Sequence, residues 1–215
     1  MQTYSEIKHQ LGILRSRDQQ LARAIKSAGI PDVRPMKPGL ATLIRIIIDQ
    51  QVSVATGAAI WRKLTAAAGG AVTARRLIEM GEAGLRNAGL SGQKARYALG
   101  LAEGYISRRL NFSSLGRATD EDIRDTLMSF KGIGPWSADI YLMFAMGRPD
   151  IWPAGDLGLQ ISLKLLNNLK TRPSPKELTN IAEPWRPYRS SAALLLWHYY
   201  SIEQEKVKFS KIRHK

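Results

Sequence analysis

The sequence predicts an all-α fold, and three of its features support this prediction. Apolar residues recur at helical spacing, as in residues 40–48, where five of them lie at i, i+3, i+4, i+7 and i+8. Helix-capping patterns precede several apolar segments. No segment alternates apolar and polar residues as a half-buried strand does. We therefore expect nine or ten helices joined by short connections rich in Gly and Pro.

The helices of the first half of the chain follow from capping residues and periodicity. One covers residues 40–48, and the next, over 54–64, follows Ser53, which can act as its N-cap. Another begins after Ser91, and Thr119 begins one with a capping-box pattern. The residues of the Ser91 helix expected to face the core are Ala95, Ala98, Leu99, Ala102 and Tyr105.

The second half of the chain is helical by the same criteria. We expect helices over residues 136–146, after Asp156, and after Ser174–Pro175, where Pro suits the first helical position. An amphipathic helix over 190–202 is the last. With 215 residues the chain suits a single domain, 1–215, made of two helical lobes. The segments expected to divide these lobes are 31–39 and 109–119.

The charge of the chain indicates a polyanionic partner. Lys and Arg number 32 against 18 Asp and Glu, which gives a net charge of +14. Nucleic acid is the first candidate and an anionic membrane surface the second. The chain has no cysteine, which excludes disulfides, thiolate zinc sites and Cys-ligated iron–sulfur clusters. The basic tail, 205–215, is interpreted either as a solvated end or as an arm that contacts phosphate.

No apolar stretch is long enough to span a bilayer, and the first twenty residues lack the apolar core of a signal peptide. We therefore expect no membrane association. The expected location is intracellular: the cytoplasm, with association to the nucleoid if the source is bacterial.

The stretch FKGIGP, residues 130–135, predicts a site for an anion. A helix ends near Phe130, and Gly132 and Gly134 can both adopt positive φ and let another backbone approach. Pro135 suits the first turn of the next helix, whose exposed N–H groups and positive dipole end attract an anion. Ile133 can anchor the hairpin. In so basic a chain the simplest anion is a nucleic-acid phosphate, although a plain turn between two helices is the alternative.

Four stretches together resemble the helix-hairpin-helix DNA glycosylase superfamily (HhH-GPD), and in particular its 3-methyladenine DNA glycosylase II branch. They are the hairpin (119–147) with its Gly/Pro-rich loop to Asp156, and the strings IIIDQQVSVATGAAIWRKL, GLSGQKARYALGLAEGY and WRPYRSSAALLLW. The resemblance covers about residues 38–202. It implies two helical lobes around a DNA-binding cleft and an enzyme that excises alkylated purines of the 3-methyladenine type from duplex DNA in base excision repair.

The resemblance also assigns roles to individual residues. Asp156 is expected to be the catalytic carboxylate, which stabilises an oxocarbenium-like sugar and orients water; its alternative role is a helix cap, and Asp139 is the rival carboxylate. The other expected roles are a base pocket of Trp136, Tyr188, Trp152 and Ile140, a DNA wedge of Gln51 with Gln50 as its neighbour, and phosphate contacts from Lys131, Gly132, Ile133, Gly134 and Ser137.

The resemblance further predicts a monofunctional enzyme that leaves an abasic site. Superfamily members that also cut the strand carry a lysine where this chain has Trp136. A purine alkylated at N3 or N7 is cationic and leaves as a neutral base, so no general acid is required. We expect no cofactor and no metal held by side chains, although the sequence leaves open a monovalent cation on hairpin carbonyls, as in relatives.

The sequence is also compatible with three other classes of protein. One is a glycosylase of the same fold for uracil, hypoxanthine or an oxidised purine. Another is a helix-hairpin-helix protein that binds DNA without catalysis, and the last is a membrane-surface protein. The expected partner is double-stranded DNA with a damaged base, bound by a monomer.

Overall fold

The computed structural model describes residues 2–33 and 36–213, with side chains described as far as Val207. All regular structure in this part is helical, which confirms the all-α prediction. The described residues form twelve α-helices and one short 3-10 helix, so the expected nine or ten was too low. One reason is α7 (Phe112–Leu115), which is too short to produce a periodic pattern.

The chain divides into two compact units. Unit 1 combines residues 1–35 with 147–215, and unit 2 comprises residues 36–146. The first division falls within the Pro-rich segment 31–39, as expected. The second falls between Met146 and Gly147, whereas we expected it within 109–119, a segment that lies inside unit 2. Unit 2 is closed near its ends by a hydrogen bond from Met36 N to Phe144 O at 2.9 Å.

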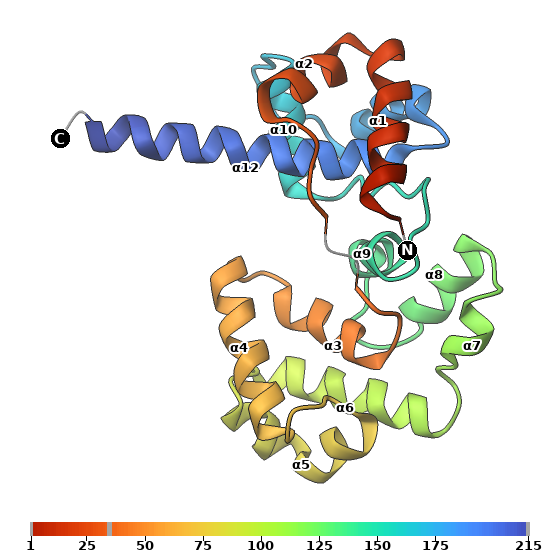
Figure 1. The fold of residues 1–215 in the computed structure, drawn as a ribbon. Helices are drawn as coiled ribbons and strands as arrows, with labels where there is room; N and C mark the ends of the chain where they lie inside the picture. The colour runs from red at the N-terminus through yellow and green to blue at the C-terminus, as the bar shows by residue number, and fades with distance from the viewer. Residues whose placement is uncertain (1, 34–35, 214–215) are drawn as a thin grey trace. The chain divides into compact units, whose positions relative to one another are not determined.

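Unit 2 begins with helices whose starts the sequence predicted. These are α3 (Leu40–Asp49), α4 (Val54–Ala67) and α6 (Gly92–Ile106), with α5 (Ala74–Asn87) packed on α6 (Figure 1). Ser53 caps α4 and Ser91 caps α6, each accepting a hydrogen bond from the backbone three residues on. Helix α3 packs on α4 and α6 and contributes six buried apolar residues to the core of this unit.

The predicted core face of α6 is confirmed except at its end. Ala95, Ala98 and Ala102 are fully buried, and Leu99 is half-buried. Tyr105, expected to face inward, is 46% exposed, and its ring lies on Phe112 with 5.7 Å between centroids. The last turn of α6 therefore meets the short helix α7 at the surface instead of the core.

The hairpin at the end of unit 2 consists of α8 (Asp120–Met128) and α9 (Pro135–Phe144), which pack on each other. Thr119 caps α8, and the expected inward residues Ile123, Leu127 and Phe130 are buried. Helix α9 also packs on α3. The hydroxyl of Tyr141 accepts a hydrogen bond from Gly39 N at 2.9 Å, which ties α9 to the residue before α3.

Unit 1 is assembled around its last helix, α12 (Arg189–Arg213), which contacts α1 (Tyr4–Arg17), α2 (Gln19–Ala28) and α10 (Leu157–Leu166). The predicted helix after Ser174 is α11 (Pro175–Ala182), which Ser174 and Glu177 start with a capping box and which leads into the 3-10 helix η1 (Glu183–Trp185). Trp185 is buried and donates its indole N–H to Asp18 at 2.7 Å.

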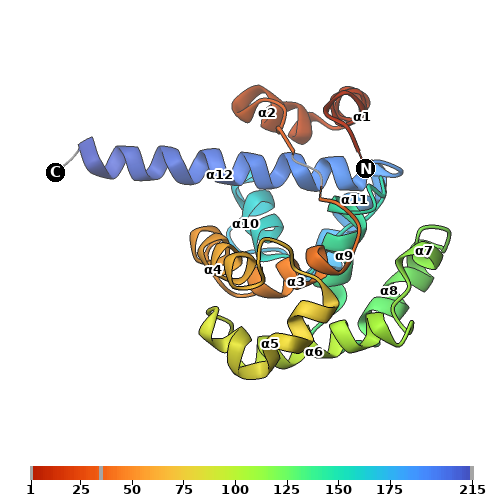
Figure 2. The same ribbon diagram turned by 60° about the horizontal axis from the view of Figure 1, so that its bottom comes forward.

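Helix α12 is much longer than the predicted 190–202 and extends past α2 and α10 (Figure 2). The basic tail continues it to Arg213, while its side chains from Lys208 onward and residues 214–215 lie outside the described part. No helix in the described ranges is long and apolar enough to cross a membrane.

Candidate active site and nucleic-acid interface

The hairpin loop in unit 2 forms a tight turn around Gly132. Gly132 has φ +93°, and a Cβ there would collide with the ring of Tyr97 on α6, so only glycine fits. Gly134 was also expected to adopt positive φ, but it is extended, with φ −101° and ψ −179°. Ile133 is 5% exposed and anchors the loop as predicted, while Lys131 is exposed.

The start of α9 has the features of an anion-binding helix terminus. Gly134 is its N-cap and Pro135 its first residue, and no side chain caps it. Its first intrahelical bond runs from Ala138 N to Gly134 O, so the N–H groups of the first turn lie at the positive end of the helix dipole. This arrangement supports the predicted phosphate-binding site at the hairpin.

Ser137 is an exception among the predicted phosphate contacts. Its side chain is 2% exposed, and its hydroxyl accepts a hydrogen bond from Gln50 Nε2 at 2.8 Å. The hydroxyl therefore points into unit 2 and is not a surface donor, which leaves Ser137 only its backbone N–H for a phosphate.

The turn after α3 separates the two glutamines that were predicted together as a DNA wedge. Gln51 is exposed and has φ +53°, a left-handed conformation that is uncommon outside glycine. Gln50 instead directs its amide inward, donating to Gly132 O and Ser137 Oγ, both at 2.8 Å. The side chain of Gln50 is thus held inside unit 2 and is not available as a wedge, whereas that of Gln51 is.

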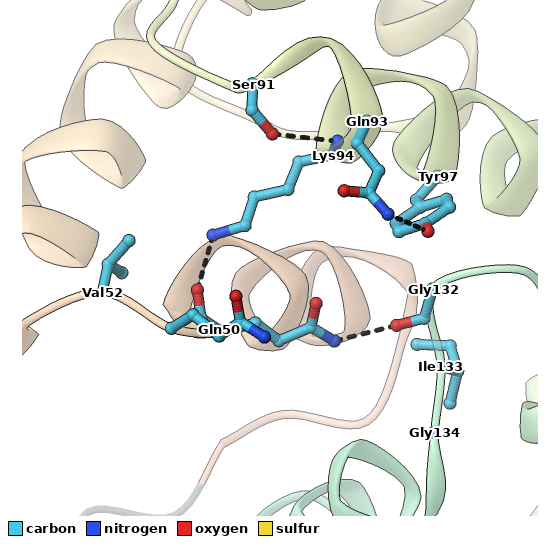
Figure 3. A pocket seen from close by; sticks show the side chains of 10 residues that line it. Gln50, Val52, Ser91, Gln93, Lys94, Tyr97, Gly132, Ile133 and Gly134 are labelled. Carbon is cyan, nitrogen blue, oxygen red and sulfur yellow. Dashed lines mark hydrogen bonds between the residues drawn. The ribbon is translucent and has the colours of Figure 1, made fainter.

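Lys94 on α6 completes this region (Figure 3). Its ammonium donates to Ile48 O at 2.8 Å and to Gln50 O at 2.7 Å, and so caps the C-terminal end of α3. Burial lowers the pKa of Lys94, and the nearby carboxylate of Asp49 opposes this effect. The turn, α6 and the hairpin loop together line a pocket of about 520 Å³.

Asp139, the rival to Asp156, has a structural partner. One of its oxygens receives hydrogen bonds from Arg124 Nε at 2.9 Å and Nη2 at 2.6 Å, and this ion pair joins α9 to α8. The side chain of Asp139 is 10% exposed. This position inside the hairpin suits a structural ion pair better than a role in catalysis.

Two predicted pocket residues lie on one face of α9. Trp136 and Ile140 are four residues apart in the helix, a spacing that stacks their side chains, and both are half-buried. They present a flat aromatic ring beside a branched aliphatic chain.

In unit 1, Asp156 is fixed by two hydrogen bonds to one of its oxygens. Oδ1 accepts from Leu159 N at 2.9 Å, so Asp156 caps α10 as predicted, and from Trp197 Nε1 on α12 at 2.8 Å. Gly158 makes this approach feasible, because a Cβ there would lie 3.0 Å from Asp156 Oδ1 and 3.1 Å from Trp197 Cδ1. The carboxylate is therefore held rigidly in orientation.

The loop that leads to Asp156 is attached to the start of α12. Arg189 donates to the carboxylate of Asp150 from Nε at 2.8 Å and from Nη2 at 3.0 Å, and to Asp150 O at 2.9 Å. The hydroxyl of Ser190 accepts from Ile151 N at 2.9 Å and donates to Arg148 O at 2.7 Å. These contacts attach the Gly/Pro-rich loop to the first turn of α12 at Arg148, Asp150 and Ile151.

Of the other two predicted pocket aromatics, Trp152 differs from expectation, while the pocket role of Tyr188 stays a prediction. Trp152 is 8% exposed and packs edge-on against Trp185, 5.4 Å between centroids, so it is a core residue of unit 1 and not a pocket wall. Tyr188 is half-buried at the start of α12. It precedes Trp197 by nine residues, or about 13 Å along a helix, so unit 1 does not bring it directly to the Asp156–Trp197 pair.

Sequence reasoning missed the roles of Trp197, Arg189, Ser190 and Lys94. All four lie within the quoted strings, but their partners are 39 to 46 residues away along the chain. Only the concentration of polar and aromatic residues in those strings pointed to them.

Residues 44–187 match a protein family described as the HhH-GPD superfamily base excision DNA repair protein. The chain therefore belongs to the HhH-GPD superfamily, as the hairpin, loop and Asp156 predicted.

Similar proteins of known sequence come from Bacillus subtilis. One, named DNA-3-methyladenine glycosylase, is 33% identical over 105 residues, which make up 49% of this chain and 35% of that protein. Another, YfjP, is 37% identical over 119 residues, 55% of this chain and 41% of that protein. The chain thus spans less than half the length of these two relatives.

Solved structures match over more of the chain. Schizosaccharomyces pombe 3-methyladenine DNA glycosylase Mag1, in complex with abasic DNA, is 25% identical with a TM-score of 0.81, covering 88% of this chain and 95% of that one. A Bacillus halodurans DNA-3-methyladenine glycosidase is 31% identical with a TM-score of 0.77, covering 91% of each chain. These likenesses confirm the fold predicted from the sequence.

Proposed function

We propose that this protein is a DNA glycosylase that excises alkylated purines of the 3-methyladenine type from duplex DNA, in base excision repair. The observation that carries the proposal is the Asp156 carboxylate, fixed by Leu159 N and Trp197 Nε1 at the end of the loop that follows the hairpin. Membership of the HhH-GPD superfamily and the likeness to 3-methyladenine glycosylases support it.

Asp156 is the catalytic residue of this proposal. The bond from C1′ to the base breaks, and its electron pair leaves with the base. The sugar then carries a developing positive charge, which a fixed carboxylate stabilises without reorganisation. Water adds to C1′, and the proton it loses passes to the surrounding solvent. A purine alkylated at N3 or N7 is cationic and departs neutral, so protonation by a general acid is not required.

The DNA is held by unit 2 in this proposal. The start of α9 and Lys131 bind phosphates, which fixes the duplex without reading its sequence. Gln51 enters the stack to fill the space left by the extruded nucleotide, a role supported by its exposure and its fixed backbone. Trp136 offers an aromatic face to the cationic base, and Ile140 lies beside it.

We further propose that the enzyme does not cut the strand. The hairpin position that holds the nucleophilic lysine in strand-cutting members of the superfamily is Trp136 here, and indole cannot form a Schiff base. The product would be an abasic site in an intact strand.

The test compares the protein with its Asp156→Asn variant on methylated duplex DNA. We expect the wild type to release 3-methyladenine and strands to break only after hot alkali. The variant should bind DNA normally and lose at least about 100-fold in rate. Strand breaks without alkali would contradict the monofunctional proposal. Release of only uracil, hypoxanthine or an oxidised purine would change the lesion class, and binding without any release would leave a DNA-binding protein.

A further inference from the structure

The turn after α3 carries Gln51, the predicted wedge. Inside unit 2, the side chain of Gln50 joins this wedge turn to the hairpin loop. The amide nitrogen of Gln50 donates to Gly132 O in the hairpin loop and to Ser137 Oγ in the first turn of α9, both at 2.8 Å. The backbone of Gln50 at the same time forms the C-cap of α3 and precedes Gln51 directly. One residue thus belongs to the turn through its backbone and to the hairpin through its side chain.

Lys94 fixes the same turn from the opposite side. Its ammonium binds the carbonyl of Gln50 (Figure 3) and that of Ile48, and these two residues flank the last residue of α3. These carbonyls would otherwise lack intrahelical partners, and a cation is favourable at the C-terminal end of a helix. The peptide group between Gln50 and Gln51 is therefore held at its oxygen by Lys94.

These contacts explain how Gln51 keeps its left-handed backbone. A non-glycine residue at φ +53° is disfavoured by about 1 to 2 kcal/mol, so the surrounding structure must enforce it. The amide of Gln50 and the ammonium of Lys94 provide that enforcement from the hairpin and from α6. Tyr97, one turn after Lys94, lies against Gly132 and adds a packing contact between α6 and the hairpin loop.

We propose that Gln50 and Lys94 are positioning residues that couple the phosphate-binding hairpin to the Gln51 wedge, so that docking on phosphates also presents Gln51 at one defined depth and angle. This inference rests on the proposed function. Neither residue touches the reacting atoms in this scheme. Their contribution is to the extrusion of the nucleotide, and it should matter most when the target base is well paired.

The test uses two duplexes that differ only in how firmly the target is held. Both contain one N7-methylguanine, opposite cytosine in the first and opposite thymine in the second. Single-turnover excision is measured for the wild type, Gln50→Met and Lys94→Met. We expect each variant to lose about tenfold opposite cytosine, the effect of about one hydrogen bond, and less than about threefold opposite thymine. The dissociation constant for undamaged duplex should change less than about twofold.

Several controls separate positioning from a general loss of structure or charge. Lys63→Met removes an exposed charge from α4 and should change the excision rate on neither duplex. Gln51→Ala should reproduce the dependence on pairing, whereas Asp156→Asn should lose equally on both duplexes. Lys94→Arg should recover part of the rate. Equal losses on both duplexes in Gln50→Met and Lys94→Met, or a parallel loss of binding, would overturn the proposal.

A second readout keeps this inference distinct from the proposed function. Fluorescence of 2-aminopurine at the target position rises when the base is unstacked by bound protein, whether or not any bond is broken. If the wild type excises nothing yet raises this fluorescence and both variants do not, the coupling stands and the glycosylase proposal fails. If the variants raise it as the wild type does, the coupling is wrong.

Discussion

Trp197 Nε1 and Asp156 Oδ1 lie 2.8 Å apart, which connects the middle of α12 to the first residue before α10. We expect Trp197→Phe to keep a smaller aromatic ring at this position and lose the hydrogen bond. A hydrogen bond to a charged group contributes about 1.5 to 3 kcal/mol, so excision at saturating DNA should fall at least about tenfold. Tyr200→Phe, on the same helix, should leave the rate unchanged. Equal rates in both variants would show that Trp197 does not position Asp156.

Gly158 should be nearly as important as Trp197, although it has no functional group. A methyl group at this position would lie 3.0 Å from Asp156 Oδ1 and 3.1 Å from Trp197 Cδ1, closer than carbon normally approaches. We expect Gly158→Ala to push the two apart and lower the excision rate while α10 gains helix propensity. The check is the rate together with thermal unfolding. A stable variant of full activity would contradict this account.

The ion pair between Arg124 and Asp139 should stabilise the hairpin. Removing one partner leaves a largely buried charge, so we expect Arg124→Met to lower the free energy of unfolding by about 2 kcal/mol. Replacing both residues together, with Asp139→Leu, should recover part of the loss. Urea unfolding of the two single variants and the double variant measures the coupling. Additive effects would mean that the pair contributes nothing.

The raised pKa of Tyr141 predicts that the free energy of unfolding decreases at alkaline pH. Burial raises its pKa to about 12, although the hydrogen bond from Gly39 N acts in the opposite direction. An unfolded tyrosine has a pKa of about 10. Between these values the unfolded chain has lost the proton that the folded chain keeps, so stability falls as pH rises, by at most about 1.4 kcal/mol per unit. Tyr141→Phe should show a shallower decline between pH 10 and 12 in urea unfolding, and Tyr4→Phe should not.

The proposed phosphate-binding site at the start of α9 can be tested through the salt dependence of the DNA-binding constant. Lys131 is exposed beside the start of α9, and each phosphate contact by a cation changes the slope of log K against log salt by about one unit. We expect Lys131→Met to reduce the slope by about that amount on undamaged duplex of any sequence. Lys176→Met, an exposed lysine on α11, should not alter it. An unchanged slope for Lys131→Met would remove it from the phosphate contacts.

Local features of the fold were predictable from the sequence, because a cap and its helix are neighbours in the chain. Ser53, Ser91, Thr119, Ser174 and Asp156 all cap the helices assigned to them. The outward position of Tyr105 was not predictable, since helical periodicity gives a face but not where the packing partner ends. The length of α12 was missed because the predicted end at residue 202 followed the apolar periodicity, whereas the helix continues beyond it to Arg213.

The site was predictable only in part. The glycine-rich hairpin and Asp156 carry their chemistry in consecutive residues, so they stood out. Gln50 and Gln51 are neighbours with the same side chain, and their different environments depend on Gly132 and Ser137, more than 80 residues later. Trp152 was assigned to a pocket because it precedes Asp156, and its partner Trp185 in the core could not be inferred from spacing.

The left-handed backbone of Gln51 has a consequence for how such a protein would search a genome. A protein that scans DNA meets a vast excess of undamaged base pairs. Any conformational change of its wedge residue would have to be repeated at every one of them. Here the unfavourable geometry is already set when the chain folds, with Gln50 and Lys94 maintaining it. Under the proposed function, each encounter with DNA would then require no rearrangement of this turn.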